Sequence, residues 1–128
     1  MHIRRIEIEN IRAIKHLIWE LPEEQNGAGW HVILGDNGSG KTSFIRSIAY
    51  SLLSPSERSR LPMSGFQLRN KKSAQSKLVV RVEADPQNDF YENFTDEGYF
   101  FESQTSILDG SEVFLFFHDA HNSQTIPI

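Results

Sequence analysis

The sequence predicts an α/β fold in which antiparallel strands flank a single strand–loop–helix unit. A short apolar run at 30–34 is followed by a glycine-rich loop at 35–42. The next stretch, 42–53, has apolar positions that recur at helical spacing. On either side of this unit, apolar and polar residues alternate at 15–21 and at 77–84, the pattern of strands that bury one face.

The first two elements are expected to be strands. At 2–9, Ile6 and Ile8 lie on one face between charged residues, which we interpret as an exposed or edge strand. A turn at 10–13 separates it from the strand at 15–21, and the two strands can pair as a hairpin. One face of the second strand is apolar and comprises Leu17, Trp19 and Leu21.

The central unit comes next. The run from Trp30 to Leu34 is apolar and partly β-branched, so it predicts a buried strand. The helix over 42–53 is expected to end near Ser54–Pro55, because proline disfavours helical backbone in the residue before it. The segment 54–76 is polar and predicts an irregular loop.

The remainder of the chain predicts further antiparallel pairing. Asp109 and Gly110 form a turn, an acidic segment at 85–98 is interpreted as a solvated loop, and the tail 118–128 shows no pattern. Strands are expected at 77–84, 99–102 and 112–117.

Composition narrows the class of protein. A chain of 128 residues with 38% apolar and 23% charged residues suits one globular lobe with a real core. The net charge of −4 argues against nucleic-acid binding over the whole surface. Cysteine is absent, the N-terminus carries charge throughout, and no apolar stretch is long enough to span a bilayer. We therefore expect a soluble cytoplasmic protein that makes no membrane contact.

The loop Gly35–Thr42 is a complete G-x-x-x-x-G-K-[ST] phosphate-binding motif, and its strand–loop–helix setting is the context that such a motif requires. Glycines leave the backbone N–H groups of the loop bare so that they can surround a polyphosphate. Lys41, the predicted catalytic cation, neutralises charge on the β- and γ-phosphates, and the hydroxyl of Thr42 ligates Mg²⁺. The predicted nucleotide-binding residues of this P-loop NTPase unit are Asn37, Gly38, Ser39, Gly40, Lys41, Thr42 and Ser43.

The segments Ile6–Arg12 and Val32–Ile48 together resemble the N-terminus of the ABC-type ATPases of the RecF/SMC/DNA-repair group. This group includes the overcoming-lysogenisation-defect nucleases and anti-phage defence ATPases. The resemblance is carried by Asn-x-Arg after the first strand and by G-x-N-G-S-G-K-[ST] after the third, so it covers about residues 3–53 closely and 77–117 loosely.

The resemblance implies that residues 1–128 form a single ATP-binding lobe, the N-terminal part of a longer ATPase. Such heads hold ATP and Mg²⁺ between two subunits, so it also implies a second head as partner, and a nuclease or toxin effector or nucleic acid as a further one. Arg12, from the Asn-x-Arg motif, is carried over as a contact near the nucleotide phosphates. An alternative for Arg12 is a solvated turn residue.

The chain departs from that family after the helix. Met63–Gln67 superficially resembles the signature segment but lies too close behind the phosphate loop. In Val113–Asp119, His118 stands where the magnesium-supporting acid belongs, and Ala120 follows in place of a catalytic glutamate. The purely structural interpretation of this stretch is an aromatic strand of the antiparallel sheet. Without a general base, turnover by this chain alone should be very slow.

These departures leave two alternatives to an ATPase head. One is an ATP-binding regulatory scaffold that oligomerises and docks an effector with little hydrolysis. The other is a small self-contained P-loop protein that uses Asp119 as its acid.

Three other groups of residues were weighed. A basic window is interpreted as a solvated loop, with contact to a nucleic-acid backbone as the alternative. A metal site formed by His118, Asp119 and His121 is disfavoured because no fourth ligand is evident. Trp19 and Trp30 are expected in the core or at its rim, with a position beside the adenine as the alternative. The basic window comprises Arg58, Arg60, Arg69, Lys71, Lys72, Lys77 and Arg81.

Overall fold

The computed structural model describes residues 2–22, 31–35, 40–62, 65–84, 99–120 and 126–127. It contains a six-stranded sheet in which every neighbouring pair is antiparallel, in the order β2-β1-β3-β4-β5-β6. The strands are β1 (His2–Ile11), β2 (Ile14–Glu20), β3 (Gln75–Glu83), β4 (Tyr99–Leu108), β5 (Ser111–Ala120) and β6 (Ile126–Pro127).

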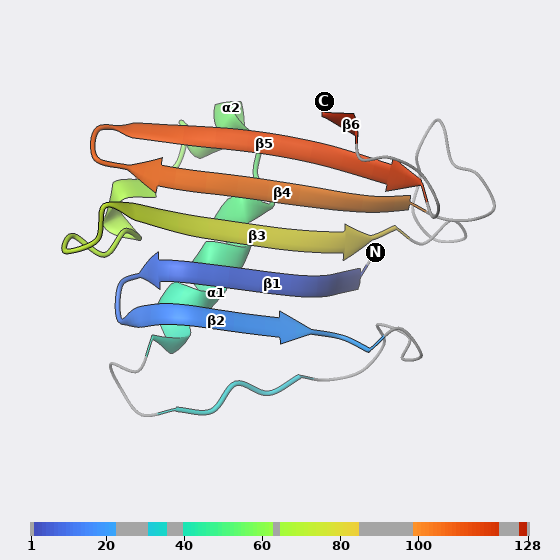
Figure 1. Ribbon diagram of the computed structural model, residues 1–128, viewed down its shortest axis with the longest axis horizontal. Helices are drawn as coiled ribbons and strands as arrows, with labels where there is room; N and C mark the ends of the chain where they lie inside the picture. The colour runs from blue at the N-terminus through green and yellow to red at the C-terminus, as the bar shows by residue number, and fades with distance from the viewer. Residues whose placement is uncertain are drawn as a thin grey trace.

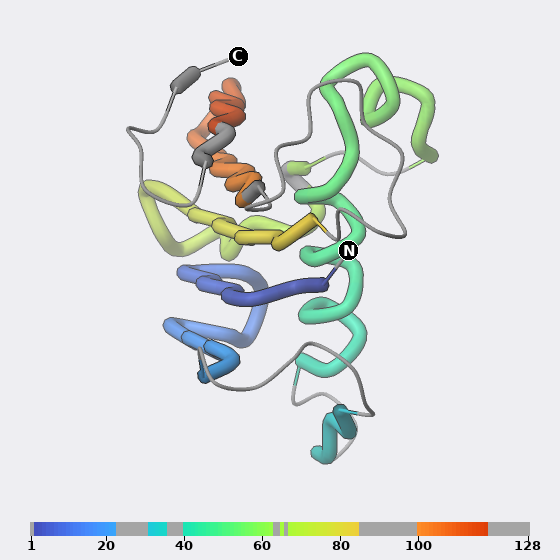
Figure 2. Tube along the Cα trace, turned by 90° about the vertical axis from the view of Figure 1, so that its right-hand side faces the viewer, coloured from blue at the N-terminus to red at the C-terminus, as the bar shows by residue number. Residues whose placement is uncertain are grey.

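One helix, α1 (Lys41–Ser51), crosses the sheet on a single face, as Figures 1 and 2 show from two directions. The core forms between this helix and the strands beneath it. It is built mainly from aliphatic side chains of β1, β3 and β4, together with Tyr50 of α1: Ile6, Ile8, Ile11, Tyr50, Leu68, Leu78 and Ile107 are all buried. The predicted antiparallel strands around a loop–helix unit are thus present.

The hairpin predicted at the N-terminus is confirmed. β1 and β2 pair antiparallel, with Ile6 opposite Trp19 and Ile8 opposite Leu17. The interpretation of the first strand as an edge strand is wrong, because β1 also pairs with β3 and its isoleucines are buried. The charges between them mark one solvated face, and a strand with one open face can still be central in an antiparallel sheet.

The predicted helix is confirmed, but only part of its apolar stripe faces the core, where Phe44 and Ile48 are partly buried. Ile45 is 57% exposed and Leu52 is 48% exposed, whereas the side chains fully covered by the sheet are those of Ser47, Tyr50 and Ser51. The two serines satisfy their own hydroxyls by donating to the carbonyls of the preceding turn, 2.6 Å for Ser47 and 2.8 Å for Ser51. Small, internally satisfied side chains therefore let the helix lie close to the sheet.

A buried strand at 30–34 is not what the structure shows. Trp30 lies outside the described residues. His31–Leu34 belong to no strand, and Val32 and Leu34 are 76% and 88% exposed. A continuous apolar run forms a strand only where both its faces are covered and a neighbour accepts its hydrogen bonds. Among the described residues, no strand pairs with this segment.

The polar segment after α1 is more ordered than predicted. It contains the short helix α2 (Pro55–Arg58) and the 3₁₀ turn η1 (Gly65–Gln67). Ser54 begins α2 with a capping box, in which its hydroxyl accepts from the N–H of Glu57 and its own N–H donates to the Glu57 carboxylate at 3.0 Å. The Ser-Pro that ends α1 therefore also starts α2.

The last strands are confirmed and run longer than predicted. β4 and β5 form a hairpin around Asp109–Gly110, where the positive φ of 82° at Gly110 suits a glycine turn. The prediction that the tail 118–128 has no regular structure is wrong, because β5 extends to Ala120 and β6 pairs with the end of β5. The acidic segment predicted at 85–98 lies outside the described residues.

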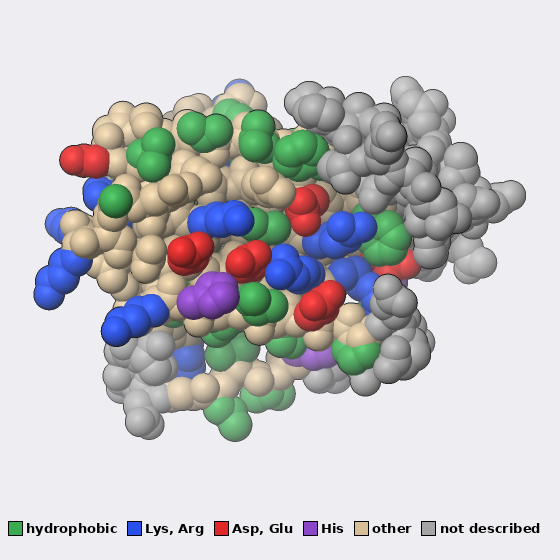
Figure 3. All heavy atoms as spheres, viewed as in Figure 1, with side chains coloured by type: hydrophobic (Ala, Val, Ile, Leu, Met, Phe, Trp, Pro, Cys, Tyr) green, Lys and Arg blue, Asp and Glu red, His purple; other side chains and the backbone are tan. Residues whose placement is uncertain are grey.

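The face of the sheet opposite α1 is open and changes character from one side to the other (Figure 3). Over β1 and β2 it carries paired charges, including Arg5–Glu7 at 3.1 Å and Arg5–Glu20 at 3.9 Å. Over β5 it carries the half-exposed side chains of Val113 and Leu115. Within the described residues, no helix is long and apolar enough to cross a membrane.

Candidate nucleotide-binding site

The phosphate-binding motif is described at its two ends. Gly35 and the stretch from Gly40 onward are placed, whereas Asp36, Asn37, Gly38 and Ser39 lie outside the described residues. The ammonium group of Lys41 donates to the carbonyl of Gly35, so the lysine side chain reaches back across the loop. A polyphosphate in the loop would offer this cation a stronger, charged partner.

Gly40 holds the turn from the loop into α1. Its φ of 100° belongs to the left-handed region that glycine tolerates, and a Cβ there would lie 3.0 Å from Cγ1 of Ile14. The first hydrogen bond of the helix runs from the N–H of Phe44 to the carbonyl of Gly40 at 2.8 Å. The N–H groups of the residues between them are therefore left without helical partners.

The N-cap residue of α1 is Gly40, which has no side chain to cap the helix, and the first turn carries no acidic residue. The free N–H groups and the positive end of the helix dipole therefore meet no negative charge from this turn. Thr42 and Ser43 present their side chains at the same end. Such a helix start suits an anion, and the predicted role of Thr42 as a ligand of Mg²⁺ stays a prediction.

The Asn-x-Arg motif forms the turn between β1 and β2 and is held in a demanding conformation. Asn10 and Arg12 have positive φ values of 55° and 50°. The Asn10 side chain donates to the carbonyl of Gln75 at 3.0 Å. The N–H of Arg12 donates to the carbonyl of Leu68 at 3.0 Å, and the side chain of Asn70 donates to the carbonyl of Arg12 at 3.0 Å. Left-handed non-glycine residues persist where surrounding contacts determine them, often at functional sites.

This turn brings Arg12 into one cavity with the start of α1. The cavity has a volume of about 610 Å³, and no carboxylate stands among the described residues that line it. Arg12 therefore shares a cavity with Thr42 and Ser43, and its contact with the nucleotide phosphates stays a prediction. The described lining comprises Arg12, Thr42, Ser43, Arg46, Gln67, Leu68 and Lys71.

Sequence reasoning missed Arg46, Gln67 and Lys71 as members of this lining. Arg46 lies four residues after Thr42, hence on the same face of α1, and that spacing could have identified it. Nothing local marks Gln67 or Lys71, because they reach the cavity through the hydrogen bonds between their loop and the β1–β2 turn.

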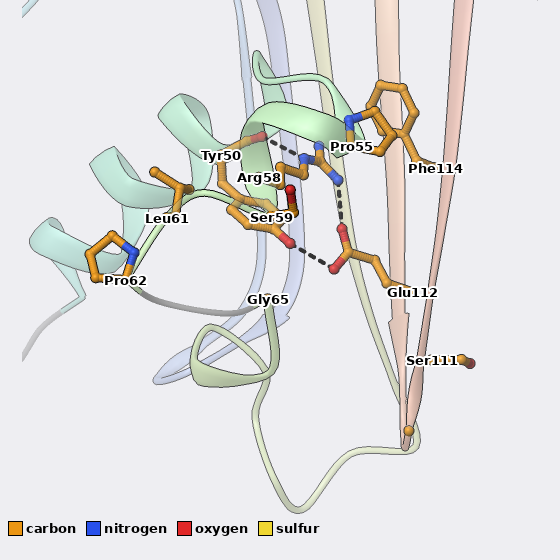
Figure 4. Close-up of a pocket in the computed structure, with 11 residues that line it drawn as sticks. Tyr50, Pro55, Arg58, Ser59, Leu61, Pro62, Gly65, Ser111, Glu112 and Phe114 are labelled. Atoms are coloured by element: carbon orange, nitrogen blue, oxygen red, sulfur yellow. Dashed lines mark hydrogen bonds and ion pairs between the residues drawn. The ribbon is translucent and has the colours of Figure 1, made fainter.

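A second pocket, of about 770 Å³, lies beside α2 at the other end of α1 (Figure 4). Arg58, interpreted from the sequence as solvated, is instead 6% exposed. Its guanidinium donates to Glu112 at 2.6 Å, to the Thr105 hydroxyl at 2.9 Å and to the Tyr50 carbonyl at 3.0 Å. It also stacks on the Tyr50 ring at 4.2 Å and on the Phe114 ring at 4.6 Å. The Arg58 guanidinium therefore has its partners within the protein, and its role is structural.

Tyr50 completes this network. Its hydroxyl donates to the other oxygen of Glu112 at 2.6 Å. Burial, followed by this bond and the negative charge of Glu112, raises the pKa of Tyr50 to about 12. Gly65 is packed so tightly here that a Cβ would lie 2.6 Å from Glu112 and 2.8 Å from the Tyr50 hydroxyl. In the signature-like segment 63–67, Gly65 therefore has a packing role, and Met63 and Ser64 lie outside the described residues.

The structure does not bring Asp119 to the phosphate loop. Four strand steps separate β2 from β5, roughly 19 Å at 4.8 Å per step. Along the strands, Asp119 pairs with Phe100 at the end of the sheet opposite the β1–β2 turn. The small self-contained P-loop protein that uses Asp119 is therefore ruled out as an interpretation, and 113–119 is the aromatic antiparallel strand of the purely structural interpretation.

The remaining sequence candidates have simpler outcomes. Trp19 packs against the core and meets His31 edge-on at 5.2 Å, so its core interpretation is confirmed. Trp30 and His121 lie outside the described residues, as do the side chains of His118 and Asp119, so the disfavoured metal cluster is not tested.

Comparisons with known proteins agree with this geometry. Residues 5–120 match the AAA domain family AAA_23. The Septu protein PtuA of Bacillus mycoides (strain KBAB4) is 32% identical over 60 residues, which span 46% of this chain and only 8% of PtuA. A solved structure from work on ATP-driven dimerization and DNA-stimulated activation of SMC ATPases has a TM-score of 0.59 at 14% identity. The match covers 98% of this chain and 72% of the chain in that structure.

Proposed function

Because the chain belongs to the AAA domain family AAA_23 and has the fold of an SMC ATPase, we propose that it is the ATP- and Mg²⁺-binding N-terminal lobe of an ABC-type ATPase head. One observation carries this proposal. The start of α1, which carries Thr42 and has no acidic residue in its first turn, and the Asn-x-Arg turn, which is far from it in the sequence, line one cavity without a described carboxylate.

The proposed chemistry divides between the loop and the helix. The loop N–H groups and Lys41 bind the β- and γ-phosphates, and Thr42 ligates Mg²⁺. Mg²⁺ supplies charge neutralisation and holds the phosphates in a fixed orientation when it is bound. Arg12 adds a guanidinium that can bond two phosphate oxygens at once.

Binding then drives association. In the proposed head, ATP bound to one lobe completes a contact with a second head, and hydrolysis releases it. By the family resemblance, this cycle serves DNA repair and maintenance or anti-phage defence. Since no described carboxylate lines the cavity, a general base for hydrolysis has to come from outside this described lining.

That lack favours a second candidate, in which the lobe is a regulatory scaffold. It would bind ATP, oligomerise and dock an effector while hydrolysing little. A measurement of mass in solution with and without ATP and Mg²⁺, paired with a turnover assay, separates the candidates. An engaged head gives ATP-dependent association with turnover, and the scaffold gives association without it.

The control for this experiment is Lys41→Ala, which should abolish ATP-dependent association while leaving the thermal unfolding transition unchanged. Association that persists in Lys41→Ala with the same ATP dependence as in the wild type contradicts both candidates, because it does not use the phosphate loop.

A further inference from the structure

We propose that Arg46 and Lys71 contact the bound nucleotide from outside the glycine-rich loop, forming with Arg12 a cation triad that neutralises its phosphates. The inference deepens the proposed function and rests on it. The three cations come from three separate segments: Arg12 from the β1–β2 turn, Arg46 from α1, and Lys71 from the loop before β3. They line the same cavity of about 610 Å³ as Thr42 and Ser43.

The described residues supply no counter-charge to this triad. In the described part of the chain, the side chains of Arg12, Arg46 and Lys71 make no ion pair or hydrogen bond with another described residue. Other arginines do pair with carboxylates: Arg58 pairs with Glu112 at 2.6 Å, and Arg69 pairs with Asp109 at 3.7 Å. Carboxylates outnumber basic residues by 17 to 13 in this chain, so they are not scarce.

Three cations around one cavity, without a partner among the described residues, repel one another unless an anion lies between them. Their mutual repulsion therefore raises the free energy of the free protein, and a bound polyanion removes that repulsion. The other lining groups agree with an anionic ligand, because Thr42 and Ser43 bring hydroxyls and the free N–H groups of the helix start. A cavity of this size is within the range of small-molecule sites.

The two walls of the cavity are held in a fixed relation. Asn70, which precedes Lys71, donates from its N–H to the Asn10 carbonyl at 3.0 Å and from its side chain to the Arg12 carbonyl at 3.0 Å. Arg46 follows Thr42 by four residues on the same helix face. Lys71 and Arg46 are thus positioned by the same contacts that position Arg12 and Thr42.

The class of ligand that matches these cations and hydroxyls is a nucleoside polyphosphate. The phosphates bound at Thr42 and Ser43 extend to the guanidinium groups, which bind phosphate oxygens bidentately, and to the Lys71 ammonium as a point charge. The amide of Gln67 is a neutral group that can hydrogen-bond the ribose or base. Affinity should therefore depend on phosphate charge and on salt.

The test is calorimetric binding of ATP with Mg²⁺ to the intact protein at three salt concentrations. The variants are Arg46→Gln, Lys71→Gln and the double variant. The matched control is the double variant Arg60→Gln with Lys72→Gln, which removes two exposed cations that do not line the cavity. Each cavity variant should raise Kd about fivefold and the double variant about 25-fold, and the double variant should flatten the salt dependence of Kd.

The outcomes separate the inference from the function. A double variant that binds ATP as tightly as the control, with the same salt dependence, overturns the inference while the proposed function stands if Lys41→Ala still abolishes binding. A wild-type protein that binds no ATP overturns both. Thermal unfolding of all variants at the wild-type temperature is expected because Arg46 and Lys71 are exposed.

Discussion

Replacing Glu112 with alanine should destabilise this fold more than any exposed ion-pair substitution. The change removes the acceptor of both Arg58, at 2.6 Å, and the Tyr50 hydroxyl, at 2.6 Å. The Arg58 side chain is only 5% exposed, so its charge remains buried without a counter-ion. Removing one partner of a buried ion pair costs about 3–5 kcal/mol.

We expect the lower end of that range, about 3 kcal/mol, because the Glu112 side chain is 24% exposed and water can enter in its place. Unfolding entropy of about 2.1 cal/mol/K per residue gives about 270 cal/mol/K for this chain, so the loss lowers Tm by about 11 °C. Arg58 keeps its bonds to Thr105 and to the Tyr50 carbonyl.

Urea denaturation of the wild type, Glu112→Ala, Arg58→Met and the double variant measures this directly. The double variant should be less destabilised than the sum of the single variants by about 2 kcal/mol, since the two residues act as one unit. Glu20→Ala is the control, because Glu20 is 67% exposed and 3.9 Å from Arg5, and should cost less than about 1 kcal/mol. A Glu112→Ala protein no less stable than Glu20→Ala refutes the reasoning.

Three further predictions concern the same fold. Because the pKa of Tyr50 is raised above 10 to about 12, its stabilising contribution is complete below pH 10 and lost as pH rises to about 12; Tyr50→Phe should remove that alkaline loss from the pH dependence of Tm. Gly65→Ala places a Cβ 2.6 Å from Glu112 and should cost about 1–3 kcal/mol in urea denaturation, and an unchanged midpoint contradicts the packing. Asn10→Ala loses the bond to Gln75 and strains a φ of 55°, so it should cost about 1–3 kcal/mol; wild-type stability counts against that turn.

Local patterns predicted the elements of this fold well. The hairpin of β1 and β2, the helix α1 and the turn at Asp109–Gly110 follow from periodicity and turn chemistry, which act between near neighbours. Ser54–Pro55 indicated the end of α1, although not the capping box that begins α2. The Asn-x-Arg motif predicted that Arg12 lies near the phosphates, and the structure shows Arg12 in one cavity with Thr42.

Features that depend on distant partners were not predicted. Arg58 appeared to be one more solvated cation, because its partner Glu112 is 54 residues away. The buried side chains of α1 include those of Ser47 and Ser51, which a search for apolar stripes overlooks. The run at 31–34 has the composition of a buried strand but lacks a paired neighbour among the described residues. Its composition alone therefore led to the wrong prediction of a strand.

The most direct test of the account is isothermal calorimetry of the intact protein with ATP and Mg²⁺, compared with Lys41→Ala. The account predicts saturable heat for the wild type, its loss in Lys41→Ala, and equal thermal unfolding for both proteins. Absence of heat in the folded wild type, or equal affinity in Lys41→Ala, would contradict a phosphate site built on the loop that ends at Thr42.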